Sequence, residues 1–348
     1  MIPLSVIIPF YNSKSDLKTT AESLLNQSLN NIEYIFVDDG SSDGSKTVIE
    51  EVLSSFPQKH SQVIITHSSP DGKNHGIAQA RQTGLDLAHG EYVIFCDSDD
   101  WVDADYYEQL YHAAVSRNAT LAVGDYCIVT NKERNKIVSP DIESWDDFKQ
   151  YPKWFHLSLW NRLIKLSLIK DNNICFFNGI NFSEDYGFVM RVYYFSKKNC
   201  NIHSNLYYYY NKTNNSSLTH TLSFTSQLHR IKCIQMLDDY FRLKNENIDD
   251  CSLHKIEKYS SKDALLTVSQ FALWKITFPE ATRMILEDST RSYIYKTVYI
   301  LGQYVSWRIL WLYHIVHKIL SSRKHTLFYI FQLNKKTYAF KPTNKSLF

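Results

Sequence analysis

Four short apolar runs follow one another in the first hundred residues: LSVIIPF at 4–10, EYIFVDD at 33–39, VIIT at 63–66 and EYVIFCD at 91–97. Their apolar residues are consecutive rather than alternating with polar ones, which is typical of strands covered on both faces. Strands of this kind belong to parallel sheets that have helices on either side. These runs restrict the possible folds more than any other feature of the sequence.

The segments between the runs have helical periodicity. Apolar side chains recur at spacings of three and four in three stripes: Leu17, Ala21, Leu24 and Leu25; Val48, Val52, Leu53 and Phe56; Ile77, Ala80, Gly84 and Leu87. Strand alternating with helix predicts an α/β fold with a doubly wound, mainly parallel sheet flanked by helices. In such sheets the ligand lies beyond the carboxyl ends of the strands.

The DSDD segment at 97–100, at the end of the fourth run, places three carboxylates within four positions. Such charges repel one another unless a cation or hydrogen-bond donors lie between them. Oxygen ligands favour Mg²⁺ or Mn²⁺, and these sites combine one or two carboxylates with water and substrate phosphates. The alternative is structural, because the same residues can form a turn and begin the next helix.

Polar residues also follow the first two runs, as Tyr11 and Asn12 and as VDDGSSDGS at 37–45. The latter predicts a tight turn and a helix capped by Asp43 or Ser45, and its paired carboxylates can also accept hydrogen bonds from a base or a ribose. Arg81 precedes the fourth run and can pair with an aspartate, reach a phosphate or lie on the surface. Neither GxGxxG after the first run nor GxxxxGK[ST] is present.

After residue 103 the pattern changes. Residues 104–118 predict a helix capped by Asp103, and residues 119–131 predict one strand that leads into a polar loop. Helical periodicity dominates 221–322, with the stripe Leu228, Ile231, Ile234, Leu237 and Phe241. We therefore predict two halves of one sheet domain at 1–103 and 104–220, and a helical C-terminal region at 221–348.

Charge is distributed unevenly along the chain. No Asp or Glu follows Asp288 but ten Lys and Arg do, so within a net charge of +2 the first 288 residues carry −8. The basic, aromatic segment 289–348 predicts contact with an anionic membrane surface. The alternatives are packing on the rest of the chain or formation of a homo-oligomer, and the acidic body argues against nucleic acid as a partner.

Several features bear on location. The first ten residues have no basic region or cleavage site, and the six cysteines are scattered without a CxxC pair, which predicts reduced thiols. The longest apolar stretch near the end, TVYILGQYVSW, is about half of the roughly 20 residues that a spanning helix needs. The expected location is the cytoplasm, with peripheral contact to the inner face of the cell membrane.

Five segments together, SVIIPFYN, VDDGSSDGS, NHGIAQARQTGLDLAHGEYVIFCDSDD, LWNRL and FSEDYGF, resemble the family 2 nucleotide-sugar glycosyltransferases of the GT-A fold. The resemblance covers roughly residues 3–220. It implies a donor site formed by Pro9, Tyr11, Asn12, Asp38, Asp39, Arg81, Asp97 and Ser98. It also implies that Asp99, with Asp97, holds Mn²⁺ or Mg²⁺, and that Asp185, with Glu184 beside it, is the catalytic base.

Two segments keep a structural alternative. FSEDYGF at 182–188 can be only a helix N-terminus capped by Ser183. In LWNRL we predict that Trp160, Asn161 and Arg162 contact the acceptor, although Trp160 can equally pack in the core. The chain departs from the family by having Gln82 where Asn is usual, and by lacking the QxxRW motif of processive, membrane-spanning synthases.

The resulting hypothesis is an inverting, metal-dependent glycosyltransferase. It would move a sugar from a nucleotide-diphosphate donor, most often UDP in this family, to a hydroxyl of a lipid-linked or growing surface glycan such as capsule or lipopolysaccharide. One alternative is a catalytically silent protein that binds sugar nucleotides or acts as a scaffold. Another is a metal-dependent nucleotidyltransferase, which leaves LWNRL and FSEDYGF unexplained.

Overall fold

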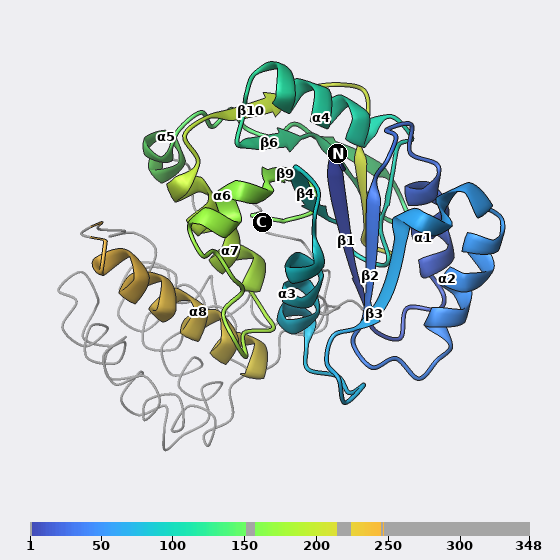
Figure 1. The fold of residues 1–348 in the computed structure, drawn as a ribbon. Helices are drawn as coiled ribbons and strands as arrows, with labels where there is room; N and C mark the ends of the chain where they lie inside the picture. Colours follow the sequence, from blue (N-terminus) through green and yellow to red (C-terminus); the bar gives the residue numbers. More distant parts are fainter. Residues whose placement is uncertain (1, 151–156, 214–223, 245, 247–348) are drawn as a thin grey trace, which may run out of the picture. The chain divides into compact units, whose positions relative to one another are not determined.

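The computed structural model describes residues 2–150, 157–213, 224–244 and 246 (Figure 1). By its contacts the chain divides into the units Met1–Glu246 and Asn247–Phe348, and all elements below belong to the first. The basic segment 289–348 lies outside the described residues, so its predicted membrane contact stays a prediction.

A seven-stranded sheet in the order β10-β6-β9-β4-β1-β2-β3 forms the centre of this unit. Its strands are β1 Leu4–Phe10, β2 Glu33–Asp38, β3 Val63–His67, β4 Tyr92–Phe95, β6 Leu121–Gly124, β9 Arg162–Lys165 and β10 Asn199–Ile202. All neighbours pair in parallel except β9, which is antiparallel to β4 and β6. The four apolar runs thus form β1 to β4, and the predicted halves 1–103 and 104–220 share this sheet.

The chain also forms a second, four-stranded sheet in the order β5-β11-β7-β8. Its strands are β5 Trp101–Val102, β11 Tyr208–Asn211, β7 Tyr126–Val129 and β8 Arg134–Ile137. The prediction of one strand over 119–131 was therefore wrong. The strand is interrupted at Asp125, so that β6 and β7 belong to different sheets. The buried Asp125 carboxylate accepts hydrogen bonds from the Ser139 backbone and from His203.

The helices connect these strands. They are α1 Leu17–Leu25, α2 Ser45–Ser54, α3 Ile77–Leu87, α4 Tyr106–Ser116, α5 Trp145–Gln150, α6 Leu166–Asp171, α7 Glu184–Phe195 and α8 Phe224–Arg242, with the 3₁₀ helix η1 Pro57–Gln62. The first three contain the predicted stripes, except that Phe56 lies beyond the end of α2. Within 221–348, the described part of the predicted helical region is α8, on which Ile234, Leu237 and Phe241 of the predicted stripe are buried.

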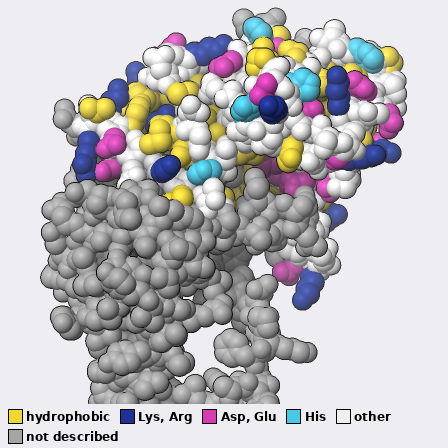
Figure 2. Space-filling model, turned by 90° about the horizontal axis from the view of Figure 1, so that it is seen from below, with side chains coloured by type: hydrophobic (Ala, Val, Ile, Leu, Met, Phe, Trp, Pro, Cys, Tyr) yellow, Lys and Arg dark blue, Asp and Glu magenta, His cyan; other side chains and the backbone are white. Residues whose placement is uncertain are grey.

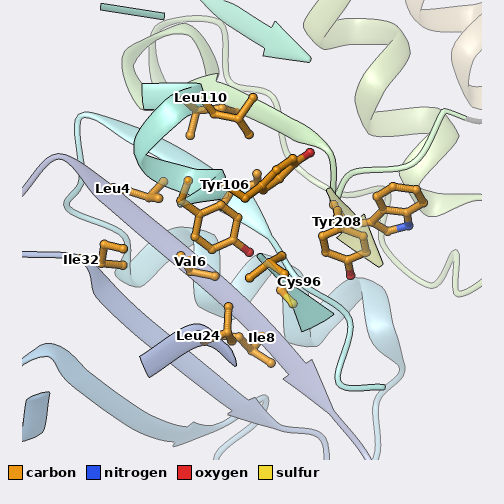
Figure 3. Packing of buried hydrophobic residues seen from close by; sticks show 14 of the residues in the cluster. Leu4, Val6, Ile8, Leu24, Ile32, Cys96, Tyr106, Leu110 and Tyr208 are labelled. Atoms are coloured by element: carbon orange, nitrogen blue, oxygen red, sulfur yellow. The ribbon is translucent and has the colours of Figure 1, made fainter. Parts of the chain in front are cut away.

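The hydrophobic core lies on both faces of the large sheet. One face packs Leu4, Val6 and Ile8 against Leu24 of α1 and Tyr106 of α4 (Figure 3). Alternate strand residues point the other way, toward α3 and α7. Gly84 of α3 lies so close to Ile7 that an added Cβ would come within 2.4 Å of it, which explains the glycine in that stripe.

The predicted caps of two helices were wrong. The N-cap residue of α4 is Asp105, not Asp103. Asp103 instead accepts hydrogen bonds from the Tyr207 backbone and the Tyr209 hydroxyl, because the β5–β11 pairing brings these groups next to it. At α2 the N-cap residue is Gly44, not Asp43 or Ser45. Asp43 lies one position earlier, and its Oδ1 accepts from the Ser45 N–H at 2.9 Å.

Two further results concern the described residues alone. Their five cysteines are free thiols, and no helix among them has the length and apolar character needed to cross a bilayer.

Candidate active site

The carboxyl ends of β1, β2 and β4 bring the first predicted residues to one edge of the sheet. Phe10 is in register with Asp38, and β4 ends just before Asp97 on the other side of β1. Ser13 and Ser98 join the two flanking loops through a 2.8 Å hydrogen bond between their hydroxyls. Segments 85 residues apart in sequence therefore form one surface.

The loop after β1 is held by the loop after β2. Asn12 has a positive φ of 48°, a conformation that asparagine tolerates better than most residues, and its Oδ1 accepts from the Ser42 N–H at 2.9 Å. Pro9 is buried within β1, whereas Tyr11 is 49% exposed. An exposed aromatic ring at the end of a buried strand offers a flat surface to a ligand.

The two carboxylates that end β2 have different surroundings, although both are buried. Asp38 accepts from the Ser41 N–H at 2.8 Å. Asp39 accepts three hydrogen bonds, from the Ser68 hydroxyl and from the backbone of His75 and Gly76. Asp39 thus fixes the chain that leads into α3.

The three carboxylates of the DSDD segment also differ. Asp100 is fully buried and accepts from the Tyr208 hydroxyl at 2.6 Å and the Asn211 N–H at 2.7 Å. Burial, with the nearby charges of Asp97 and Asp99, raises its pKa well above the usual range. Asp97 and Asp99 are only partly buried, so of the three residues these two remain accessible at the end of β4.

Arg81 connects this segment to the second carboxylate pair. Its Nη2 donates to Asp97 Oδ1 at 2.8 Å and its Nη1 to Glu184 Oε1 at 2.5 Å, while its side chain is only 5% exposed. Burial alone would lower the pKa of Arg81, but Asp97, Glu184 and Asp185 raise it above its usual value. The guanidinium therefore stays charged and links α3, the end of β4 and α7.

The second pair, Glu184 and Asp185, begins helix α7. Ser183 is the N-cap residue, as predicted, but its backbone is left-handed with φ 65° and its side chain makes no capping hydrogen bond. Burial raises the pKa of Glu184 to about 7 and also raises the pKa of Asp185, with the positive charge of Arg81 opposing both shifts. A carboxylate with a raised pKa is a stronger base once it is deprotonated.

The three residues of LWNRL lie in the interior instead of on the sheet edge. Trp160 is 6% exposed and stacks on Tyr208 with ring centroids 4.5 Å apart. Asn161 donates to the Gly124 carbonyl, and the fully buried Arg162 donates to Asn161. These contacts favour the packing alternative, because in this conformation their surfaces are already covered by protein, and an acceptor role stays a prediction.

The carboxylates at the sheet edge fit one type of metal ion. Among the described residues, no group of three or more His, Cys, Asp or Glu side chains could hold a metal on its own. A magnesium-type site does not need one, since it uses one or two carboxylates and completes its shell with water and phosphates. The partly buried side chains of Asp97 and Asp99 match that donor set.

Asn181 is the site residue that the sequence did not reveal. Its side chain accepts from the Ala78 N–H at 3.3 Å and donates to the His75 carbonyl at 3.4 Å, so it joins the start of α3 to the turn before α7. Gly76 has a positive φ of 93°, and any Cβ there would overlap the Asn181 amide. The glycine of NHGIA was the only sequence signal of this close approach.

Comparison with known proteins gives the family. Residues 5–173 match the model of Glycosyl transferase family 2. The glycosyltransferase GlyG of Streptococcus pneumoniae is 31% identical over 221 residues, which cover 59% of this chain and 70% of GlyG. The chain belongs to glycosyl transferase family 2. This confirms the family resemblance seen in the sequence, and it supports the predicted enzyme class, a glycosyltransferase.

Two further comparisons bear on this family 2 member. The cholesterol galactosyltransferase of Borreliella burgdorferi is 31% identical over 245 residues, but the chain spans only 64% of its length. The structure of Staphylococcus aureus TarS 1–349 with UDP-GlcNAc matches with a TM-score of 0.61 at 19% identity, covering 88% of this chain and 90% of that one. At this identity the match shows the fold alone, and it confirms the predicted GT-A class.

Proposed function

We propose that this chain is an inverting glycosyltransferase that moves a sugar from a nucleotide-diphosphate donor, with UDP as its nucleotide, to a hydroxyl of a lipid-linked or growing surface glycan. The observation that carries the proposal is the bridge made by Arg81 between Asp97 and Glu184. It holds a carboxylate of the DSDD segment and the acidic start of α7 within one side chain's reach. Sugar transfer needs a group that binds the donor and a general base at neighbouring positions.

The donor would lie along the edge formed after β1, β2 and β4. Tyr11 supplies an exposed ring after β1, and Asp38 supplies a hydrogen-bond acceptor at the end of the neighbouring β2. Ser98 and Asp97 follow β4, on the other side of β1. The TarS structure with UDP-GlcNAc supports a nucleotide sugar as the donor. Asp39 would act by fixing the chain between β3 and α3, since its oxygens already accept three protein hydrogen bonds.

Asp185 is the better candidate for the base. Glu184 forms an ion pair with Arg81. The hydrogen bond described for Asp185 is from the adjacent Tyr186 N–H to its Oδ1 at 2.7 Å. Asp185 would take the proton from the acceptor hydroxyl as that oxygen attacks the anomeric carbon and the bond to the diphosphate breaks. A single displacement of this kind inverts the anomeric configuration.

Asp99 and Asp97 would hold the Mn²⁺ or Mg²⁺ ion, together with the donor diphosphate. When bound, the ion stabilises the negative charge of the departing diphosphate. Asp97 Oδ1 is held by Arg81 at 2.8 Å, so the bridge would also fix the orientation of this carboxylate.

The proposed contact with the acceptor involves a segment outside the described residues. Segment 289–348, which has ten basic and no acidic residues, would bind the anionic inner surface of the cell membrane, where a lipid-linked acceptor would be found.

Asp185→Asn tests the proposal directly. The purified full-length chain is incubated with UDP-, GDP- and dTDP-sugars, with Mn²⁺ or with a chelator, and nucleotide release is measured. We expect release from one donor in Mn²⁺, loss of activity in chelator, and a loss of about 100-fold or more in Asp185→Asn, the usual contribution of general base catalysis. UDP binding by the variant should remain within about twofold of wild type.

Each alternative predicts a different result. A silent binding protein binds a sugar nucleotide without turning it over, and a nucleotidyltransferase releases pyrophosphate from a nucleoside triphosphate. Substantial turnover by Asp185→Asn contradicts the assignment of the base, and full activity in chelator contradicts the assignment of the metal.

A further inference from the structure

Helix α8 contacts the turn from which the proposed catalytic helix begins. The turn consists of Asn181, Phe182 and Ser183, and Glu184 and Asp185 follow it directly at the start of α7. The family model ends at residue 173, so neither the turn nor α8 belongs to the matched segment. What this turn contacts decides where the two carboxylates lie.

Three residues on one side of α8 hold the turn. The Asn181 N–H donates to His229 Nδ1 at 3.2 Å. Arg230 Nε donates to the Ser183 hydroxyl at 3.4 Å, and its guanidinium lies 4.8 Å from the centre of the Phe182 ring. The fully buried thiol of Cys233 lies 3.2 Å from the Ser183 carbonyl. Every residue of the turn therefore has a partner on α8.

The turn needs such support because its backbone is strained. Ser183 has a φ of 65°, a left-handed conformation that is unfavourable for a residue with a side chain and persists only where the surroundings enforce it. Close packing leaves the helices little room to shift, since a Cβ on Gly187 of α7 would come within 2.8 Å of Cys233 Sγ.

The same turn also touches the donor side. Asn181 binds the backbone at His75 and Ala78, where α3 begins, and Asp39 holds the adjacent Gly76. Helix α3 carries Arg81, whose guanidinium reaches Glu184. The turn that α8 contacts is therefore linked to Asp39 at the end of β2, through the start of α3, and is followed directly by the acidic start of α7.

We propose that α8 is a positioning element for catalysis, in which His229, Arg230 and Cys233 hold the Asn181–Ser183 turn so that Asp185 is placed to act on the acceptor. This inference rests on the proposed function. The three residues act through the turn and touch no reacting atom, so their loss should reduce kcat and leave donor binding intact. A small misplacement of a catalytic group can lower the rate by about 100-fold.

His229 offers a matched pair of substitutions. Leucine and asparagine have nearly the same shape, but only asparagine keeps an acceptor near the position of Nδ1. We expect His229→Leu to lower kcat by about tenfold or more, with the KM for the donor within about twofold of wild type. His229→Asn should recover most of that loss, and Met236→Ala, on an exposed part of α8, should match wild type.

A second readout does not depend on activity. Hydrogen exchange of the amides at 181–187, followed by mass spectrometry in the full chain, should be faster in His229→Leu than in wild type or His229→Asn. If no sugar nucleotide is turned over by the wild type, the proposed function is wrong, and the exchange comparison still shows whether α8 holds the turn.

Two results would overturn the positioning role. One is a kcat for His229→Leu within twofold of wild type, and the other is an equal loss in His229→Leu and His229→Asn with unchanged exchange. If His229→Leu does not fold, Cys233→Ala and Cys233→Ser are compared by the same measurements, since serine keeps a donor for the Ser183 carbonyl.

Discussion

At the scale of single residues, Arg81 shows how much one buried cation can organise. A buried guanidinium is stable only when its charge is compensated, and here carboxylates on two different elements compensate it. The pairing is mutual, because Glu184 and Asp97 would repel each other without the guanidinium between them. Removing the cation therefore leaves uncompensated charge at the centre of the site.

Replacing Arg81 should change both the rate and its pH dependence. Arg81→Lys keeps the charge but cannot donate in a planar fork to two carboxylates, so we expect kcat/KM to fall by about 100-fold. In Arg81→Gln the positive charge that lowers the pKa of Asp185 is lost. Because the base acts deprotonated, the acid limb of the pH profile should move to higher pH.

The measurement is kcat/KM for sugar transfer between pH 5 and 9. Arg134→Gln, at an exposed position on β8, serves as the control and should keep the wild-type profile. An unchanged acid limb in Arg81→Gln would contradict the electrostatic role of the bridge.

At the scale of elements, His203 ties three segments near the break between the two sheets. It follows β10, its Nδ1 lies 3.0 Å from the buried Asp125 between β6 and β7, and its Nε2 lies 3.1 Å from Asp141 after β8. Burial lowers the pKa of His203, but its hydrogen bonds to the two carboxylates outweigh this and raise it overall.

This tie should make stability depend on pH. A group whose pKa is raised by folding stabilises the fold fully below its unfolded pKa, and that contribution is lost as the pH rises through the folded pKa. His203→Gln should therefore lower the thermal midpoint more at pH 5.5 than at pH 8.5. Since His203 is partly exposed, we expect a difference of only about 1–3 °C.

Calorimetry of the full chain at the two pH values checks this expectation. His60→Gln, at an exposed position where the ring contacts the Leu53 carbonyl, is the matched control and should change the midpoint equally at both. A larger effect of His203→Gln at pH 8.5 would have the wrong sign for the ion pairs.

At the scale of the whole molecule, the first 288 residues and the rest of the chain differ in net charge. On the face shown in Figure 2, the described residues have interspersed Lys, Arg, Asp and Glu side chains, and no large patch of one sign is visible among them. The ten basic residues after Asp288 stand in contrast to this mixture. Attraction to an anionic bilayer should therefore depend on that segment.

Neutralising three of these charges in the full chain tests the membrane proposal. The triple variant Lys318→Gln, Arg323→Gln and Lys324→Gln should float with anionic liposomes at least about tenfold less than wild type, at roughly 1 kcal/mol for each basic residue. The matched control neutralises the exposed Lys18, Lys46 and Lys73 of the body and should float like wild type. Equal flotation of both variants, or none by wild type, would contradict the proposal.

The sequence by itself determined the family and the first four strands of the large sheet. Consecutive apolar runs and helical stripes are local patterns, so they predicted β1 to β4 and α1 to α3. The split of 119–131 could not be predicted in this way, because both strands are equally apolar and only the partners of Asp125 decide where the chain leaves one sheet for the other.

Only the tertiary structure decided what surrounds each acidic residue. From the sequence Asp38 and Asp39 are alike, as are Asp97, Asp99 and Asp100. The fold buries Asp39 and Asp100 against protein donors, whereas Asp99 and Asp97, to which Arg81 donates, are only partly buried. The links from Arg81 to Glu184 and from Asn181 to His229 were equally invisible, because each joins residues far apart in the chain and depends on distances that packing alone sets.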